Sequence, residues 1–324
     1  MDPESRTYLM VKVAKQYFEE GMTQLEIAKS LHISRSTVSR LLSRAREENI
    51  IQIAVDVPPG LYPELEKSLE GFQGLEEVIV VETREYDSPQ RIALELGQAA
   101  ASYLVRTIQN NDVIGFAWGT TMKAMVDAVQ PKKIPGIKVF QMNGGLTSQM
   151  TKIHGTSLTR NLASRFGGDA FMLQAPGVVD NPETQKLILS DRQISQIFDF
   201  ADGATMAFLG VGTVARDTLW GRAGLLTDKV IDELKSLGAV GDIMSRYYDA
   251  SGKLVNSSLC QRVIGIPIDR FLRIKRRIGV AGGLGKFEAI LGAIRGGYIN
   301  VLITDHLTAG KLSRSMENKD GNPN

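Results

Sequence analysis

Cysteine and histidine are scarce in this sequence, which has one cysteine (Cys260) and three histidines among 324 residues. A single thiol excludes an intramolecular disulfide and a thiolate-rich zinc site, so we expect no metal, no cofactor and a reducing, cytoplasmic compartment. No run of about eighteen apolar residues occurs, and Met1–Arg6 lacks the basic-then-apolar pattern of an export signal. These absences predict a soluble protein that is not exported.

Net charge is also small, +2 from 38 basic and 36 acidic residues, so overall electrostatics does not indicate a nucleic-acid-binding protein. The distribution of charge is more informative. Residues 34–46 contain four arginines and no acid, whereas residues 56–87 contain nine acids against two basic residues. This pattern predicts that contact with an anion is confined to one element. The alternative is a solvated, charged helix face.

Three short helices are predicted at the start of the chain. Apolar residues at helical spacing predict the first helix over residues 8–20. Thr23 and Glu26 form the pattern of a capping box at the start of the second helix. Ser34 is expected to cap a third helix that runs to about Glu48.

The second and third helices have the marks of a helix-turn-helix. Ala28 is small where the two helices must cross, and apolar neighbours fix their angle. His32 stands at the turn, where glycine is commonest, but histidine tolerates a positive φ. The exposed half of the third helix would enter the major groove of operator double-stranded DNA. The candidate DNA contacts are Arg35, Ser36, Thr37, Ser39, Arg40 and, toward phosphates, Arg44. The alternative is a helical hairpin used for packing or dimerisation.

A domain boundary is predicted after the third helix. Residues 50–57 alternate in polarity and are rich in β-branched side chains, which predicts a short strand such as the wing of a winged helix. Pro58, Pro59 and Gly60 then break the pattern. We expect a DNA-binding domain over 1–57, a linker helix within 58–75, an effector and oligomerisation domain over 76–312, and a flexible polar tail over 313–324.

Beyond the linker, apolar runs alternate with helical stretches. Strands are predicted at residues 78–81, 113–117, 137–142, 170–173, 206–211, 277–281 and 300–304. This alternation predicts an α/β domain with a Rossmann-like parallel sheet that is covered by helices on both faces. Ligands of such folds bind at the carboxyl ends of the strands, so the loops there are the first places to seek a site.

Several motifs resemble those of the SorC-type (sugar-operon) transcriptional regulators, and the resemblance covers nearly the whole chain. Besides the helix-turn-helix, they are residues 114–121, 143–145, 208–213, 238–243 and 280–305, of which the last is the most specific. The resemblance implies an effector domain similar in fold to glucosamine-6-phosphate deaminase and ribose-phosphate isomerase. It also implies a sugar or sugar-phosphate effector and a homo-oligomer, either a dimer or a tetramer.

The glycine-rich loops supply most of the candidate effector contacts, which are Gly119, Thr120, Thr121, Asn143, Gly144, Gly145, Asp242 and Lys286. The first three follow a strand and begin a helix, so N–H groups and hydroxyls converge as a phosphate requires. The next three close another strand, where an amide can exchange hydrogen bonds with sugar hydroxyls. The last two are implied by the family motifs. Weaker candidates are His154, Arg262 and Trp118, and each of these residues also has an ordinary structural explanation.

The main alternative is an enzyme, similar to a sugar-phosphate isomerase or deaminase and fused to a DNA-binding domain, because fold alone does not decide function. Acid–base catalysis would need paired carboxylates or a histidine in the pocket, and only His32, His154 and His306 exist. A Gly-x-Ser-x-Gly elbow is absent, and residues 282–287 lack the hydroxyl residue that follows lysine in a Walker loop. A third possibility is a large domain that only oligomerises. We expect a regulator without catalytic residues.

Overall fold

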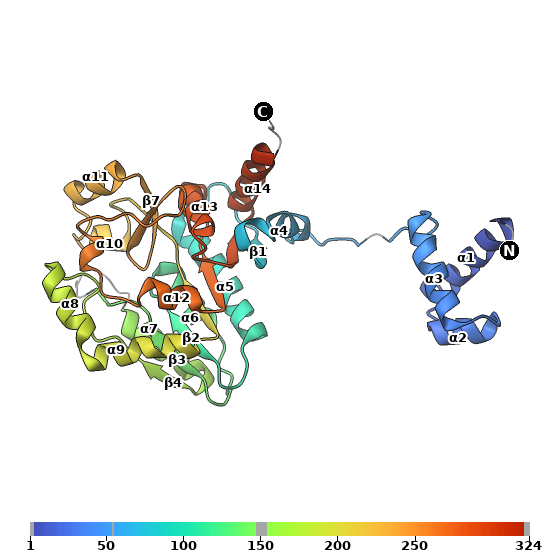
Figure 1. The fold of residues 1–324 in the computed structure, drawn as a ribbon, viewed down its shortest axis with the longest axis horizontal. Coiled ribbons are helices and arrows are strands. Elements are labelled where there is room, and N and C mark those ends of the chain that lie inside the picture. Colours follow the sequence, from blue (N-terminus) through green and yellow to red (C-terminus); the bar gives the residue numbers. More distant parts are fainter. Residues whose placement is uncertain (1–2, 54, 147–153, 321–324) are drawn as a thin grey trace. The chain divides into compact units, whose positions relative to one another are not determined.

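The structure is a computed structural model that describes residues 3–53, 55–146 and 154–320 (Figure 1). The chain divides into two compact units, Met1–Pro58 and Pro59–Asn324, and each is described by itself. Among the described residues, no helix is long and apolar enough to cross a membrane.

The first unit consists of helices α1 (Pro3–Phe18), α2 (Gln24–Ser30) and α3 (Arg35–Glu47). The predicted capping box is confirmed, because the Glu26 N–H donates to Thr23 Oγ1 at 3.3 Å and the Thr23 N–H donates to Glu26 Oε2 at 2.8 Å. Ser34 caps α3 as predicted, since its Oγ accepts from the Thr37 N–H at 3.1 Å. His32, in the turn between α2 and α3, has a φ of +53°.

One small core holds these three helices together. Its buried side chains come from all three helices and are Met10, Val13, Ile27, Ala28, Val38, Leu41, Leu42 and Ala45. Ala28 therefore lies at the helix crossing, where a small residue was expected.

The predicted wing was wrong, because residues 50–53 and 55–57 contain no strand. Ile50 and Ile51 instead donate their N–H groups to the Ala45 carbonyl and pack against the core of the first unit. The apolar side chains that follow, Ile53, Val55 and Val57, are exposed. The described part of this unit contains no strand with which this segment could pair. A lone strand without a partner is not stable.

The second unit is built on a seven-stranded, fully parallel sheet in the order β1-β10-β9-β5-β2-β3-β4. Its strands are β1 (Glu77–Val81), β2 (Val113–Phe116), β3 (Lys138–Gln141), β4 (Asp169–Phe171), β5 (Met206–Leu209), β9 (Arg276–Val280) and β10 (Val301–Asp305). The predicted α/β parallel-sheet fold is confirmed.

Helices cover both faces of this sheet, so its strands are apolar on both sides. Along β5, Met206 and Phe208 belong to one buried cluster, whereas Ala207 and Leu209 belong to another. The first cluster includes α5 (Pro89–Thr107), α6 (Thr120–Ala128) and α7 (Gly155–Phe166). The second includes α4 (Pro63–Leu69), α9 (Arg192–Asp199), α12 (Ile268–Arg273), α13 (Phe287–Arg295) and α14 (His306–Asp320).

The remaining elements include a small antiparallel sheet of β6 (Gly212–Thr213), β7 (Ala239–Ile243) and β8 (Arg246–Asp249). Shorter helices are α8 (Pro182–Ser190), α10 (Leu219–Arg222) and α11 (Asp228–Ser236), with 3₁₀ turns at Phe72–Gly74, Phe200–Gly203, Cys260–Arg262 and Leu284–Lys286 (η4). The expected tail needs correction, because α14 continues to Asp320 and Met316 is buried against the core. Residues 321–324 lie outside the described part of the chain.

Candidate functional site

The candidate effector site lies at the carboxyl edge of the parallel sheet, where the strand order reverses. From β2 the chain moves through β3 to β4, and β5 then returns to the other side of β2 and leads on to β9 and β10. Such a reversal leaves a crevice in which α/β proteins bind ligands. The candidate residues follow β2, β3 and β9, or lie in the β7–β8 hairpin.

The loop after β2 leads directly into the N-terminus of α6. Gly119 is the N-cap residue and supplies no side-chain cap, and a Cβ on it would meet no atom of the described residues within 4 Å. Thr120 is exposed and Thr121 is half-buried. The first N–H groups of a helix have no partners within the helix, so this terminus can bind an anion.

The loop after β3 contains one buried side chain with an unused acceptor. Asn143 is 4% exposed, and its Oδ1 has no hydrogen-bond partner among the described residues. Gly144, by contrast, donates its N–H to the Ile264 carbonyl and accepts from the Trp118 indole at 2.9 Å. A Cβ on Gly144 would lie 2.3 Å from the Pro176 carbonyl oxygen, so packing explains this glycine. The Gly145 N–H is also used, since it donates to the Ala175 carbonyl.

The three weaker candidates have structural explanations. Trp118 is buried, and its ring centroid lies 5.4 Å from that of Trp220, so it is part of the core. Arg262 donates to the carbonyls of Ser258 and Val179 at 3.0 and 3.2 Å. His154 is exposed at the N-terminus of α7 and does not cap that helix.

Asp242 and Lys286 form the electrostatic centre of the site. Asp242 is buried in β7, and its Oδ2 accepts from the Ser245 N–H at 2.9 Å. Burial raises the pKa of Asp242 to about 6, against the opposing effects of that hydrogen bond and of the Lys286 charge. Burial lowers the pKa of Lys286, although Asp242 and Asp217 act in the opposite direction. Lys286 Nζ donates to the Val211 carbonyl at 2.8 Å.

The hairpin that carries Asp242 adds residues that the sequence did not reveal. Met244 and Ser245 form its turn with φ values of +49° and +64°, which non-glycine residues seldom adopt. Ser245 is buried, and its Oγ has no partner among the described residues. Gln141, at the end of β3, is likewise buried with an unpartnered Oε1. A glutamine inside an apolar strand was the one signal that the sequence offered.

Arg246 follows this turn and is the strongest addition to the site. Its Nη2 donates to the Gly265 and Ile266 carbonyls at 3.0 and 2.5 Å, whereas Nη1 is buried without a partner among the described residues. Burial lowers the pKa of Arg246 to about 10. Nη1 and the Asn143 Cβ lie 3.3 and 3.4 Å from the place where a Cβ on Gly265 would stand. An unused donor and an unused acceptor therefore lie in one neighbourhood.

Asp305 fixes the glycine loop that leads to Lys286. This buried carboxylate accepts from the Gly283 N–H at 2.5 Å and from the Thr308 hydroxyl at 2.7 Å. Gly283 has a φ of +93°, and a Cβ on Gly282 would lie 2.3 Å from Asp305 Oδ2. Both glycines are therefore required by this loop, which positions η4 and Lys286.

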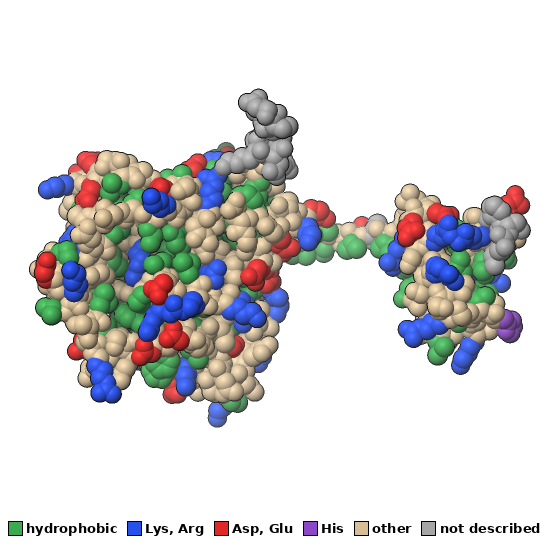
Figure 2. All heavy atoms as spheres, in the orientation of Figure 1, with side chains coloured by type: hydrophobic (Ala, Val, Ile, Leu, Met, Phe, Trp, Pro, Cys, Tyr) green, Lys and Arg blue, Asp and Glu red, His purple; other side chains and the backbone are tan. Residues whose placement is uncertain are grey.

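The candidate DNA-binding residues lie in the first half of α3, except Arg44, which lies in its last turn. Arg35, Ser36, Ser39 and Arg40 are exposed, whereas Thr37 and Arg44 are half-buried. The hydroxyls of Ser36 and Thr37 lie 2.8 Å from Ser34 Oγ and so belong to the helix cap. Arg44 pairs with Glu48 at 3.1 Å. Figure 2 shows further Lys and Arg side chains on the visible face of this unit.

Comparison with known proteins supports both units. A family model described as a sugar-binding domain matches residues 60–313, and a model of sigma-70 region 4 matches residues 12–48. The chain is 35% identical to the deoxyribonucleoside regulator of Bacillus subtilis, over 98% of this chain and 100% of that protein. It is 32% identical to the sorbitol operon regulator of Klebsiella pneumoniae, over 94% of this chain and 97% of that protein.

A solved structure agrees with these sequence matches. The full-length sorbitol operon regulator SorC from Klebsiella pneumoniae superposes with a TM-score of 0.73 at 31% identity, covering 94% of this chain and 98% of that one. A helix-turn-helix unit followed by an α/β sugar-binding domain defines a DNA-binding transcriptional regulator. More particularly, the chain belongs to the SorC-type family of transcriptional regulators.

Proposed function

We propose that this regulator controls genes of carbohydrate metabolism in the cytoplasm, through operator binding that depends on a sugar or sugar phosphate. Residues 1–57 contact the operator, residues 58–75 link the two domains, and residues 76–312 bind the effector and form a homo-oligomer. The similarity to regulators named for sorbitol and deoxyribonucleosides supports a carbohydrate ligand.

The observation that carries the proposal is a pair of buried polar atoms, Arg246 Nη1 and Asn143 Oδ1, that have no hydrogen-bond partner among the described residues. A hydroxyl group can accept from Arg246 Nη1 and donate to Asn143 Oδ1, so one polyol hydroxyl would satisfy both atoms. Buried polar groups without partners cost about 1–3 kcal/mol each, which a matching ligand would recover. The α6 N-terminus and the Lys286 ammonium favour a phosphate at the other end of the ligand.

Effector binding would change DNA affinity by shifting an equilibrium between subunit arrangements, because the spacing of recognition helices then changes. In the operator complex, Arg35, Ser39 and Arg40 reach base edges, and Ser36 and Thr37 lie beside them at the helix start. Arg44 exchanges Glu48 for a phosphate.

Thermal unfolding against a panel of sugars, polyols and their phosphates at millimolar concentration tests the effector site, since a ligand specific to the folded state raises the melting temperature. We expect one sugar phosphate to raise it, and Lys286→Ala to abolish the rise. The matched control is Lys235→Ala, at an exposed lysine in α11. A rise that survives both Lys286→Ala and Thr120→Val would place the effector elsewhere.

An enzyme remains the competing proposal, because a carboxyl with a pKa of about 6 can act as a general base near neutral pH. The same panel decides between the two functions. Product analysis after prolonged incubation should find every sugar phosphate unchanged, while the bound effector alters operator affinity. If the wild type converts one of these compounds and the Asp242→Asn variant does not, the enzyme would be favoured.

A further inference from the structure

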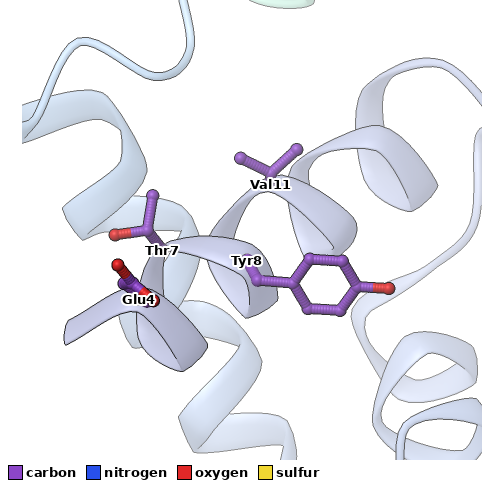
Figure 3. A pocket seen from close by; sticks show the side chains of 4 residues that line it. All are labelled: Glu4, Thr7, Tyr8 and Val11. Carbon is purple, nitrogen blue, oxygen red and sulfur yellow. The ribbon is translucent and has the colours of Figure 1, made fainter. Parts of the chain in front are cut away.

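The outer face of α1 carries apolar side chains that the first unit leaves uncovered. Met10 and Val13 point into the core, whereas Tyr8 is 68% exposed and Val11 is 38% exposed. Together with Glu4, Lys15 and Phe18 they define the α1 stripe, whose spacing of 4, 3, 4 and 3 residues matches a heptad seam. Figure 3 shows the shallow hollow that Glu4, Thr7, Tyr8 and Val11 line on this helix.

We propose that the α1 stripe pairs with the α1 stripe of a second copy of this chain, with the two helices antiparallel. A twofold axis midway between residues 9 and 10 places Tyr8 opposite Val11 of the other copy. The same axis places Glu4 opposite Lys15, so the apolar centre has an ion pair at each end. Such an interface is isologous and closes with two copies.

Charge selects this arrangement over a parallel one. In parallel register, Glu4 would face Glu4 and Lys15 would face Lys15, and like charges in contact are unfavourable. Within one chain Lys15 already pairs with Glu19 at 3.8 Å, but both side chains are well exposed and the contact is weak. Lys15 therefore stays available to Glu4 of the other copy.

The tether to the second unit permits the pairing. The described residues between Glu47 and Pro63 form neither helix nor strand, so this segment can extend by roughly 3.3 Å per residue. DNA is a poorer occupant of the stripe, because the charges of Glu4 and Lys15 cancel, whereas α3 exposes arginines and has no acid in its first turn.

Cysteine cross-linking of the full-length protein tests the pairing directly. In a Cys260→Ser background, Glu4→Cys combined with Lys15→Cys should give a covalent dimer under oxidised glutathione. The two cysteines cannot bridge within one helix, because eleven residues span about 16.5 Å and a disulfide needs α-carbons within about 7 Å. Neither single cysteine variant should form a cross-link. The double variant Ser5→Cys with Gln16→Cys, whose cysteines are also eleven residues apart, should not form one either. A dimer from the single variants, or none from the Glu4/Lys15 pair, would overturn the proposal.

A second measurement joins the stripe to operator binding, and it alone rests on the proposed function. Tyr8→Glu should weaken operator binding at least tenfold, whereas Tyr86→Glu, at a tyrosine that is 92% exposed in the second unit, should leave it unchanged. If cross-linking succeeds and Tyr8→Glu has no effect, the pairing stands and its role in operator binding is refuted. If neither Tyr8→Glu nor the wild type binds any operator, only the proposed function fails.

Discussion

Tyr62 stacks on His306, with ring planes within 10° of parallel and centroids 5.0 Å apart. Tyr62 is the N-cap residue of α4, and His306 begins α14, which lies beside α4 (Figure 1). The residue before His306 is Asp305, whose carboxylate holds the Gly283 N–H of the loop that leads to Lys286. A contact path therefore runs from the candidate effector site to the first helix after the tether.

Removing the stacked ring should uncouple effector binding from operator binding. We expect Tyr62→Ala to reduce the effector-induced change in operator affinity by about tenfold, a typical allosteric coupling. Its affinity for the effector itself should change far less, because Tyr62 lies outside the candidate site. Operator titrations with and without effector measure the coupling, and Tyr86→Ala is the matched control. Unchanged coupling in Tyr62→Ala would show that this path carries no signal.

Asp242 should make the protein less stable as pH rises. Its pKa is about 6 in the folded protein and 3.8 in the reference state, so between these values the folded state holds a proton that the unfolded chain releases. The free energy of unfolding therefore falls, by about 3 kcal/mol in total, as pH rises from about 4 to about 6.

Asp242→Asn should abolish this loss, so the variant should melt at a higher temperature than the wild type at pH 7.5 but not at pH 4. Asp249→Asn should change stability in the opposite direction, since hydrogen bonds from Ser251 and Lys253 lower the pKa of Asp249. That variant should lose stability at pH 7.5. Thermal unfolding at the two pH values decides, and equal effects of both variants at pH 7.5 would contradict the assignment.

Two glycines after β5 should respond differently to a methyl group. A Cβ on Gly212 would lie 2.0 Å from Asp242 Oδ1, whereas one on Gly210 would meet only the Val280 carbonyl oxygen at 3.9 Å. Gly212→Ala should therefore cost about 1–3 kcal/mol, typical of overpacking, while Gly210→Ala should cost little. Denaturant unfolding compares them, and a similar loss in both variants would contradict the geometry around Asp242.

Two arginines of α3 should affect operator binding in distinguishable ways. Arg40→Ala should cost about 1–3 kcal/mol on the cognate operator and relax the preference for one base pair. Arg44→Ala should weaken binding to all sequences alike and lower the slope of log affinity against log salt by about 1. Binding at several salt concentrations, to cognate and substituted operators, separates the two. If the base preference is lost in Arg44→Ala and not in Arg40→Ala, then Arg44 reads the base and Arg40 contacts a phosphate.

Local rules predicted the first unit well because its interactions are close in sequence. The capping box needs only Thr23 and Glu26, three residues apart, and the positive φ of His32 follows from the short turn between two capped helices. The alternation of apolar runs with helical stretches along the chain was likewise sufficient to predict the parallel sheet. The wing failed because a strand needs a partner, and the alternation in residues 50–57 carries no information about one.

The candidate site was harder to predict because it depends on contacts distant in sequence. Arg246 Nη1 and the Asn143 side chain both lie beside Gly265, and no local motif indicates that arrangement. Gly144 matched a ligand loop in sequence, yet its close neighbour is the Pro176 backbone, more than thirty residues later. The roles of Asp242 and Lys286 came from the family resemblance, and the structure adds that Asp242 is buried, that Lys286 is half-buried and that their pKa values shift in opposite directions.

The absence of helix and strand from the described residues between Glu47 and Pro63 has a practical consequence. A splice at residue 58 lies after Ile50 and Ile51, which pack on the core of the first unit, and before Tyr62, which packs on a core of the second. It therefore interrupts no helix or strand and leaves these contacts in place. The first unit is therefore an exchangeable cassette: a foreign DNA-reading module grafted at residue 58 would inherit the ligand response of the second unit, and so redirect one chemical signal to a different promoter.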